Sequence, residues 1–329
     1  MTNNIDVQSL LFEQIKSSND EKLVDLLCDN LNISIDAAYR RIRNEKLLTI
    51  DEVVVLCKRF NLSIDNHIGL VSKTKLVPFS FPFSDLNFDF KDYLKSILLN
   101  LKTVQEAGGT VYFSAKDVPM FHFFQLKELS KFKLFYWMKT MLSRKDLVGV
   151  KFSEFELDDE SLTICQAIAD CYAKINSIEI WNYETIHGLT SQISYYKTIG
   201  FITPAEKTVL LDEVSRLLKH LQIEAELGKK FLLGKKEIAA VGDFKLLFNE
   251  VLAADNSIYA EFGNQKATFI PSIILNYITT YDEDYCNYIK SVFESVMKKS
   301  TLISEVNEKD RSLFFTYNFE RIEQQKNIQ

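Results

Sequence analysis

Closely spaced helix-start and helix-stop signals divide the first seventy residues, and this spacing most constrains the fold of the chain. Segment 20–30 is a short amphipathic pattern with leucines on one face. Residues 31–34 supply an Asn that tolerates a left-handed turn and a Ser that caps the next helix. Further capping patterns occur at 49–52 and 63–65. We therefore expect five short helices in a first domain, 1–71, with a tight helix-turn-helix at its centre.

The second helix of this motif is the most positively charged stretch of the domain, SIDAAYRRIRNEK at 34–46. Apolar residues recur in it at i, i+3, i+4 and i+7, and we expect this stripe to be buried. The stripe is Ile35, Ala38, Tyr39 and Ile42. The opposite arc then faces solvent, and it consists of Asp36, Ala37, Arg40, Arg41, Arg43 and Asn44.

This arc has the chemistry of a helix that enters the major groove of DNA. Small side chains near the helix start permit close approach, and Arg or Asn reaches base edges or phosphates one turn later. The order of segments LVDLLCDNLNISIDAAYRRIRNEK and LTIDEVVVLCKRFNLSID resembles the DNA-binding domain of lambda-repressor/Cro-like (XRE-class) bacterial transcription regulators. The resemblance covers residues 7–71.

The resemblance implies a specific set of DNA contacts. In such regulators a dimer presents the second helix of the motif to the major groove. By position, Asp36, Ala37 and Arg40 would face bases, while Arg41, Arg43 and Lys46 would lie nearer phosphates. Ser34 and Asn44, at the two ends of the helix, complete the candidate interface.

Charge makes dimerisation part of the hypothesis. The chain has a formal net charge of −6, which argues against nucleic acid binding over its whole surface. Residues 1–72 contain eight Lys or Arg against eleven Asp or Glu. One such domain should bind DNA weakly, because neutralised phosphates supply much of the affinity. We therefore expect a homodimer.

A segment rich in Pro and Phe, 72–88, separates the first domain from the rest. It holds two of the chain's five prolines, Pro78 and Pro82, which alternate with Phe79, Phe81 and Phe83. We interpret it as a linker or as an extended arm packed on one of the domains, since three solvated Phe would be costly.

Residues 89–329 mix helical and strand-like patterns, so we expect an α+β fold that is mainly helical. Helices are predicted over 89–107, 118–142 and 158–173, and a short strand over 110–114. A capping box with Pro at the first helical position predicts a long helix after Thr203. Strand-like runs between 244 and 272, separated by turn residues, predict a small antiparallel sheet.

The larger domain lacks recognisable catalytic or metal-binding motifs. Its aromatic-dense stretch 112–137 leaves two interpretations open, a core and a pocket for an apolar or ring-bearing effector. No HExxH, CxxC, GxSxG or phosphate-loop pattern is present, and the five Cys are scattered. We expect no metal, no cofactor, no catalytic residues and no enzyme activity.

The leading hypothesis is a transcription regulator that binds double-stranded DNA and carries a C-terminal dimerisation or effector-sensing domain. The effector is either a small molecule or a protein. We expect a cytoplasmic protein, because the sequence shows no signal peptide and no membrane span. The alternative is a helical adaptor that binds another protein. An enzyme whose catalytic groups are distant in sequence is the third reading.

Overall fold

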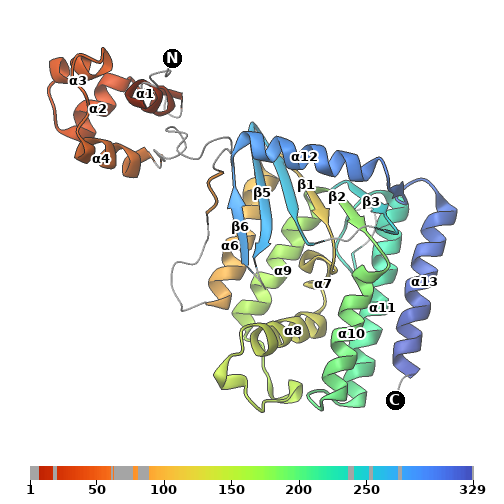
Figure 1. Cartoon of the computed structure of the whole chain (residues 1–329). Helices are drawn as coiled ribbons and strands as arrows, with labels where there is room; N and C mark the ends of the chain where they lie inside the picture. The colour runs from red at the N-terminus through yellow and green to blue at the C-terminus, as the bar shows by residue number, and fades with distance from the viewer. Residues whose placement is uncertain are drawn as a thin grey trace. The chain divides into compact units, whose positions relative to one another are not determined.

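The chain forms two compact units, Met1–Val77 and Pro78–Gln329. The computed structural model describes residues 7–17, 21–60, 62, 77–80, 89–235, 241–251, 255–272 and 276–327 (Figure 1). Of the expected linker, Val77–Ser80 is described, and Ser80 exchanges two backbone hydrogen bonds with Thr279. Among the described residues, no helix is both long enough and apolar enough to cross a membrane.

The first unit contains four described helices around a small apolar core. Leu26, Leu27 and Leu56 are buried in that core, together with Leu11 and Ile15. The fifth helix that we expected after Ser63 lies outside the described residues. The four helices are α1 (Val7–Ser17), α2 (Leu23–Leu31), α3 (Ile35–Ile42) and α4 (Ile50–Phe60).

The second unit is built on one seven-stranded sheet with the strand order β6-β5-β4-β1-β2-β3-β7. Strands β1, β2 and β3 are parallel, whereas β4, β5 and β6 are antiparallel to their neighbours. The strands are β1 (Thr110–Ser114), β2 (Asn176–Trp181), β3 (Phe244–Phe248), β4 (Ile258–Phe262), β5 (Gln265–Ser272), β6 (Asn276–Thr280) and β7 (Thr301–Leu302).

The prediction of a small antiparallel sheet is therefore wrong, because the sheet has seven strands and mixes parallel with antiparallel pairs. Only the antiparallel pairing of β4 with β5 matches the predicted meander, and β6, which the sequence analysis did not predict, extends it. Strand β3, which we had assigned to the meander, pairs in parallel with β2. The cause is the connection, because helices link β1 to β2 and β2 to β3, and a helical crossover returns the chain in the same direction.

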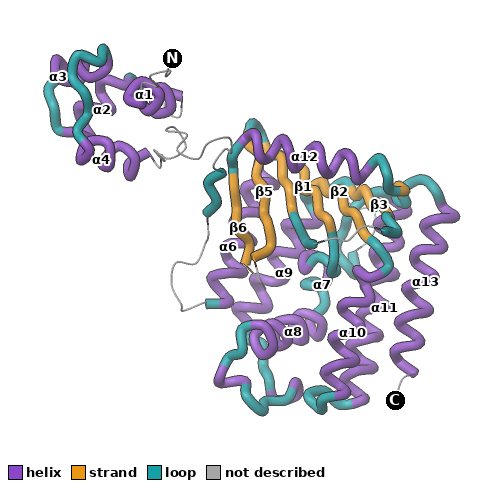
Figure 2. The backbone as a smooth tube through the Cα atoms, in the orientation of Figure 1, coloured by secondary structure: helices purple, strands orange, loops and turns teal. Residues whose placement is uncertain are grey.

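Helices cover both faces of this sheet (Figures 1 and 2). On β1, Val111 and Phe113 point to the large core formed with most helices, whereas Tyr112 points to a smaller core beneath α12. The helices are α6 (Phe90–Glu106), α7 (Met120–Phe123), α8 (Lys127–Tyr136), α9 (Asp159–Ala173), α10 (Glu184–Thr198), α11 (Pro204–Leu227), α12 (Glu283–Met297) and α13 (Glu308–Asn327). The fold is α+β and mainly helical.

Local signals placed several of these helices, but the continuous helix expected over 118–142 is wrong. The capping box at Thr203 is present, and α11 ends at Gly228 with φ 64°. The segment 118–142 instead contains α7, α8 and a π-helical turn, Trp137–Met141. The helical pattern breaks at Phe124–Gln125. There the amide of Leu126 donates to the carbonyl of Phe123, three residues earlier, which forms a tight turn and does not continue the α-helix.

Candidate nucleic-acid interface

A three-residue turn joins α2 to α3 in the first unit. Asn32 adopts a left-handed conformation, with φ 51°, after the last turn of α2. Ser34 caps α3, and its hydroxyl accepts a hydrogen bond of 3.3 Å from the amide of Ala37. Both residues do what their side chains favour, because Asn tolerates positive φ and Ser satisfies a free amide at a helix start. The turn fixes α3 relative to α2.

The solvent-facing side of α3 differs from the sequence prediction by about one residue of helical rotation. Ala38 is fully buried, as expected, but Ile35 is 62 % exposed and Tyr39 is 45 % exposed. Arg41, which we expected to face outward, is only 3 % exposed. At about 100° per residue, the buried arc runs through Ala38 and Arg41, and the exposed arc runs from Ile35 to Arg40. The exposed arc is Ile35, Asp36, Tyr39, Arg40 and Arg43.

An ion pair accounts for the inward orientation of Arg41. Its guanidinium makes two hydrogen bonds to the Glu52 carboxylate, of 3.2 and 2.5 Å, and a third of 3.1 Å to the carbonyl of Ala37. Glu52 also accepts the amide of Thr49, so it caps α4 at the same time. The prediction that Arg41 faces outward is therefore wrong. Its role here is to join α3 to the start of α4.

Gln8 of α1 supports the loop after α3. Its side-chain amide donates to the carbonyls of Arg41 and Lys46, at 2.8 and 3.2 Å, and its oxygen accepts the amide of Leu48 at 2.7 Å. The same amide donates to the side chain of Asn44, which has φ 57°. Asn44 therefore ends α3 in a left-handed conformation, a structural role that the periodicity of the sequence did not indicate.

The remaining candidates lie at the surface. Asp36, Arg40, Arg43 and Lys46 are exposed, and Ala37 is half-buried. Arg43 forms two hydrogen bonds with Glu45, of 2.8 and 3.2 Å. The hydrogen bond and the charge of Glu45 raise the pKa of Arg43 further, so it is always cationic. Among the described residues, none makes a hydrogen bond or ion pair with the Arg40 guanidinium, which leaves its donors available to a ligand.

The pKa of Glu52 is below its usual range. Burial alone would raise it, but the hydrogen bond from Arg41, the amide of Thr49 and the charges of Arg41 and Lys46 together lower it. The carboxylate therefore stays ionised, and its pair with Arg41 persists at neutral pH. Electrostatics thus preserve the orientation of α3 under physiological conditions.

In the second unit, a buried polar network surrounds Glu179 of β2, an interior strand of the sheet. Its carboxylate accepts hydrogen bonds from Tyr172 at 2.7 Å, Trp181 at 2.9 Å and the ring of His122 at 2.9 Å. Burial opposes its charge, but His122, then Lys230 and Tyr172, lower its pKa overall. Glu179 and His122 are almost inaccessible. With its acceptor positions occupied by protein donors, this carboxylate stabilises the core.

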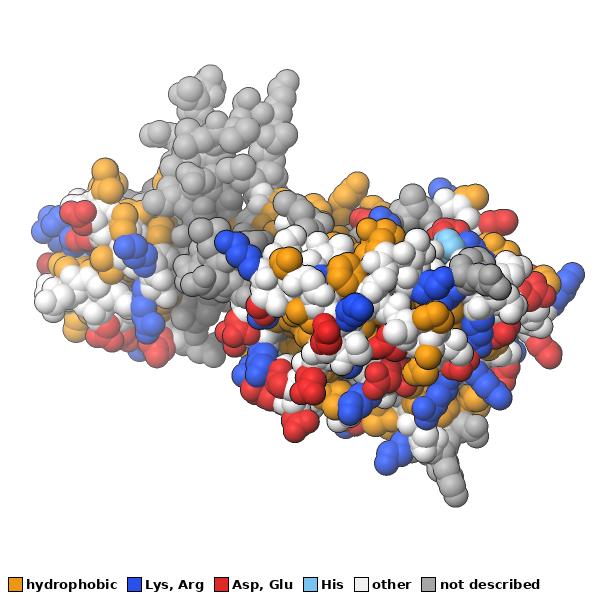
Figure 3. All heavy atoms as spheres, turned by 90° about the horizontal axis from the view of Figure 1, so that it is seen from below, with side chains coloured by type: hydrophobic (Ala, Val, Ile, Leu, Met, Phe, Trp, Pro, Cys, Tyr) orange, Lys and Arg blue, Asp and Glu red, His pale blue; other side chains and the backbone are white. Residues whose placement is uncertain are grey.

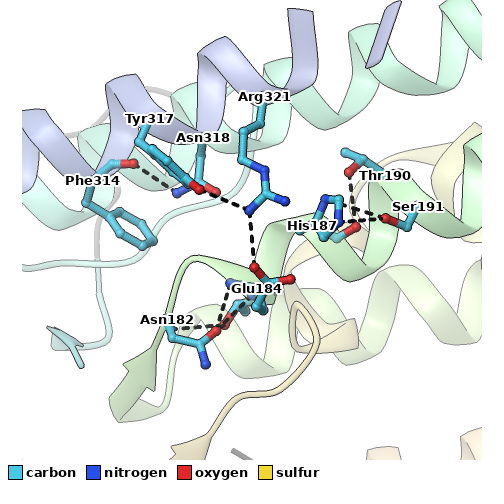
Figure 4. A network of polar contacts seen from close by, with 10 residues as sticks. Asn182, Glu184, His187, Thr190, Ser191, Phe314, Tyr317, Asn318 and Arg321 are labelled. Carbon is cyan, nitrogen blue, oxygen red and sulfur yellow. Dashed lines mark hydrogen bonds and ion pairs between the residues drawn. The ribbon is translucent and has the colours of Figure 1, made fainter. Parts of the chain in front are cut away.

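A second polar network joins α10 to α13 (Figure 4). Arg321 of α13 donates to Glu184, at 3.2 Å, and to the hydroxyl of Tyr317, at 3.3 Å. Asn182 accepts the first amide of α10 and so caps it. Burial, and then the charge of Arg321, lower the pKa of His187 on the next turn. These contacts hold the C-terminal helix against α10.

The described residues of the second unit form no metal cluster, and the face of this unit in Figure 3 has no continuous basic patch. Among the described residues, no group of three His, Cys, Asp or Glu side chains is placed to hold a metal ion. On the face shown in Figure 3, the Lys and Arg of this unit are interspersed with Asp and Glu. The cationic arc of α3 is thus the candidate site that best matches nucleic acid.

No known protein family, curated protein or solved structure is detectably similar to this chain.

Proposed function

We propose that the protein is a DNA-binding transcription regulator that acts as a homodimer, with α3 as its recognition helix. The observation that carries this proposal is the exposed arc of α3, which combines the unpaired donors of Arg40 with the apolar side chains of Ile35 and Tyr39. Arg reads guanine or binds phosphate, and apolar groups contact the methyl group of thymine.

The support beneath α3 suits this role. A recognition helix must be held rigidly, because base-edge hydrogen bonds tolerate little displacement. The cap at Ser34, the pair between Arg41 and Glu52, and the bonds of Gln8 fix the start, the middle and the end of α3 respectively. Arg41 therefore contributes to DNA binding through position rather than through contact.

Selection from a random pool of duplex DNA at several salt concentrations tests the proposal. We expect enrichment of a two-fold symmetric site by the full-length protein. Replacing Arg40 with Ala should weaken binding to the selected site by about 1–3 kcal/mol and relax preference at one base pair. Arg59→Ala is the matched control, since Arg59 is an exposed arginine of the same unit in the last turn of α4. No enrichment at low salt would contradict DNA binding.

A protein-binding adaptor is the second candidate, and one observation favours it. Leu47, in the loop after α3, is 70 % exposed, and Ile50, the first residue of α4, is 82 % exposed; Val54 of α4 is also exposed. Exposed apolar side chains in a cluster suit a protein surface. If the adaptor reading is correct, Arg40→Ala should leave the partner interaction intact, whereas Ile50→Asp should weaken it.

A further inference from the structure

A cavity of about 270 Å³ lies in the second unit between α6 and the antiparallel half of the sheet. Its walls are mainly apolar, with Ile97 and Leu101 from α6 opposite Val111, Ile258 and Phe269 from the strands. The topology accounts for this space. Helices link the parallel strands β1, β2 and β3, whereas α6 precedes β1 and packs against α9 and β4. Side chains of α6 and of the short helix α7 line this space without filling it.

A smaller hollow of about 80 Å³ adjoins the cavity and is polar. The two share Tyr93, Phe113, Met120 and Tyr277 in their walls, which places them next to each other. Asp117 and Lys133 line the hollow but not the large cavity. The combined space therefore has a long apolar part and a compact polar end.

Lys133 is an unusual side chain to find in such a wall. It is 3 % exposed, and its ammonium donates a hydrogen bond of 2.8 Å to Gln192. The ring centre of Trp137 is 5.1 Å away. An ammonium has three N–H donors. One N–H bonds to Gln192, and the others face aromatic rings or the hollow. A hydrogen-bond acceptor on a ligand could therefore bind the ammonium.

Asp117 balances the charge of Lys133 across the hollow. Burial lowers the pKa of Lys133 to about 8, and the charge of Asp117 opposes this only in part, so the Lys133 ammonium is mostly protonated at neutral pH. The carboxylate lies against Gly188 of α10, where a Cβ atom would come within 2.5 Å of it. Among the described residues, none makes a hydrogen bond or ion pair with the Asp117 carboxylate. It is therefore available to accept a hydrogen bond from a ligand.

We infer that the cavity binds a small, largely apolar molecule whose compact head is neutral overall and carries both a hydrogen-bond acceptor, for Lys133, and a donor, for Asp117. The charge balance selects this class. An anionic head would pair with Lys133 but be repelled by Asp117, and a cationic head would pair with Asp117 but be repelled by Lys133. Either head leaves a net charge in the site, and burying a net charge is costly. A primary amide is the simplest head with both functions. This assignment is independent of DNA binding; only the role of the ligand as an effector rests on the proposed function.

Calorimetric titration of the full-length protein with octanamide, octanoate and octylamine tests the inference without DNA. We expect octanamide to bind at least about 10-fold more tightly than the two charged probes. Equal affinities for all three probes, or no saturable binding of any, would overturn the assignment.

Charge variants make the test sharper. Asp117→Asn removes the repulsion of an anion, so octanoate should gain affinity relative to octylamine. Lys133→Met should reverse that order. Lys131→Met is the matched control on the same helix: Lys131 packs over Phe152, does not line the hollow, and should change no preference. Charge variants that leave the order of the probes unchanged would refute the roles of both residues.

A blocking variant tests the apolar part. Ser96 of α6 lines the cavity from a half-buried position, so Ser96→Trp should fill the space and abolish binding of all three probes. Unchanged binding by a folded Ser96→Trp protein would place the ligand elsewhere. Octanamide is then added to the selected DNA complex; a change in DNA affinity identifies an effector, and no change confines the ligand to another role.

Discussion

Replacing Lys133 with Met should stabilise the second unit at neutral pH. Burial lowers the pKa of Lys133 to about 8 from an ordinary 10.5, and the charge of Asp117 opposes this only in part. At about 1.4 kcal/mol per pH unit, that difference corresponds to about 3 kcal/mol of lost stability while the ammonium is charged. Methionine has a similar length and carries no charge, so the substitution removes this cost.

Two losses reduce the net gain. The variant leaves the amide oxygen of Gln192 without its donor, which costs about 1 kcal/mol at a half-buried position. It also loses the attraction of the ammonium to Trp137, about 0.5–1 kcal/mol. We therefore expect a net stabilisation of about 1–2 kcal/mol at pH 7.

The pH dependence identifies the cause. Between pH 8 and 10.5 the unfolded chain still holds a proton on Lys133 that the folded protein has released. Stability of the natural protein therefore rises with pH in this window, and the variant lacks this rise. The advantage of Met is full below about pH 8 and disappears above about pH 10.5. Lys230, whose pKa is also about 8, contributes equally to both proteins and cancels in the comparison.

Urea unfolding followed by tryptophan fluorescence measures the effect. The chain has two tryptophans, Trp137 and Trp181, and both belong to the second unit. Lys131→Met is the control, because it removes the same charge from a half-buried site and should give a small, pH-independent change. A Lys133→Met protein that is less stable than the natural one at pH 7, or a difference that stays constant from pH 7 to 10, would refute the reasoning.

Two further substitutions separate structural from functional side chains. Arg41→Ala should lower the stability of the first unit by about 2 kcal/mol, because it removes the partner of Glu52, whereas Arg40→Ala should change it by less than about 0.5 kcal/mol; equal melting shifts by circular dichroism would contradict the assignment. Glu179→Gln should cost about 3 kcal/mol at pH 7. Because the pKa of Glu179 is lower in the folded protein than in the unfolded chain, its charge stabilises the fold at any pH above the unfolded pKa. This stabilisation is lost as the pH falls through the folded pKa. The destabilisation by Glu179→Gln should therefore shrink below about pH 4. A destabilisation that does not depend on pH would show that the charge of Glu179 is not its cause.

Signals that act within one or two helical turns predicted the local structure well. Ser34 and Thr203 cap their helices, and Asp89 caps α6, because each bond joins groups two or three residues apart. Such contacts form whatever surrounds the segment. The structure therefore confirms the helix starts predicted after Ser34 and Thr203 and at Asp89, and the strand over 110–114.

The facing of α3 was not predictable from its own periodicity. Counting apolar residues placed Tyr39 inward and Arg41 outward, and the structure has the reverse. The cause lies outside the helix, since Glu52 of α4 supplies a buried partner that makes an inward Arg41 favourable. The sequence did contain one relevant signal, the capping residue Glu52 eleven positions after Arg41, which could have indicated a partner for an inward Arg41.

Parallel strand pairing and the cavity depend on still more distant contacts. Strands β2 and β3 are separated by two helices, and no local pattern reveals whether their pairing is parallel. The polar hollow combines Asp117, which follows β1, with Lys133 of α8. Sequence indicated only an aromatic-dense stretch and left core or pocket open. The structure supports both, because Phe113 is buried and also lines the cavity.

The salt dependence of DNA binding would report how many cationic side chains contact phosphates and how many copies of the protein bind. With Arg41 occupied by Glu52, the exposed cations on α3 and just after it are Arg40, Arg43 and Lys46. Three phosphates neutralised per copy give a slope of log affinity against log salt of about −3, and a dimer about −5. Arg43→Ala should reduce the magnitude by about 0.9 for a monomer and about 1.8 for a dimer. An unchanged slope would mean that Glu45, rather than phosphate, holds Arg43 in the complex.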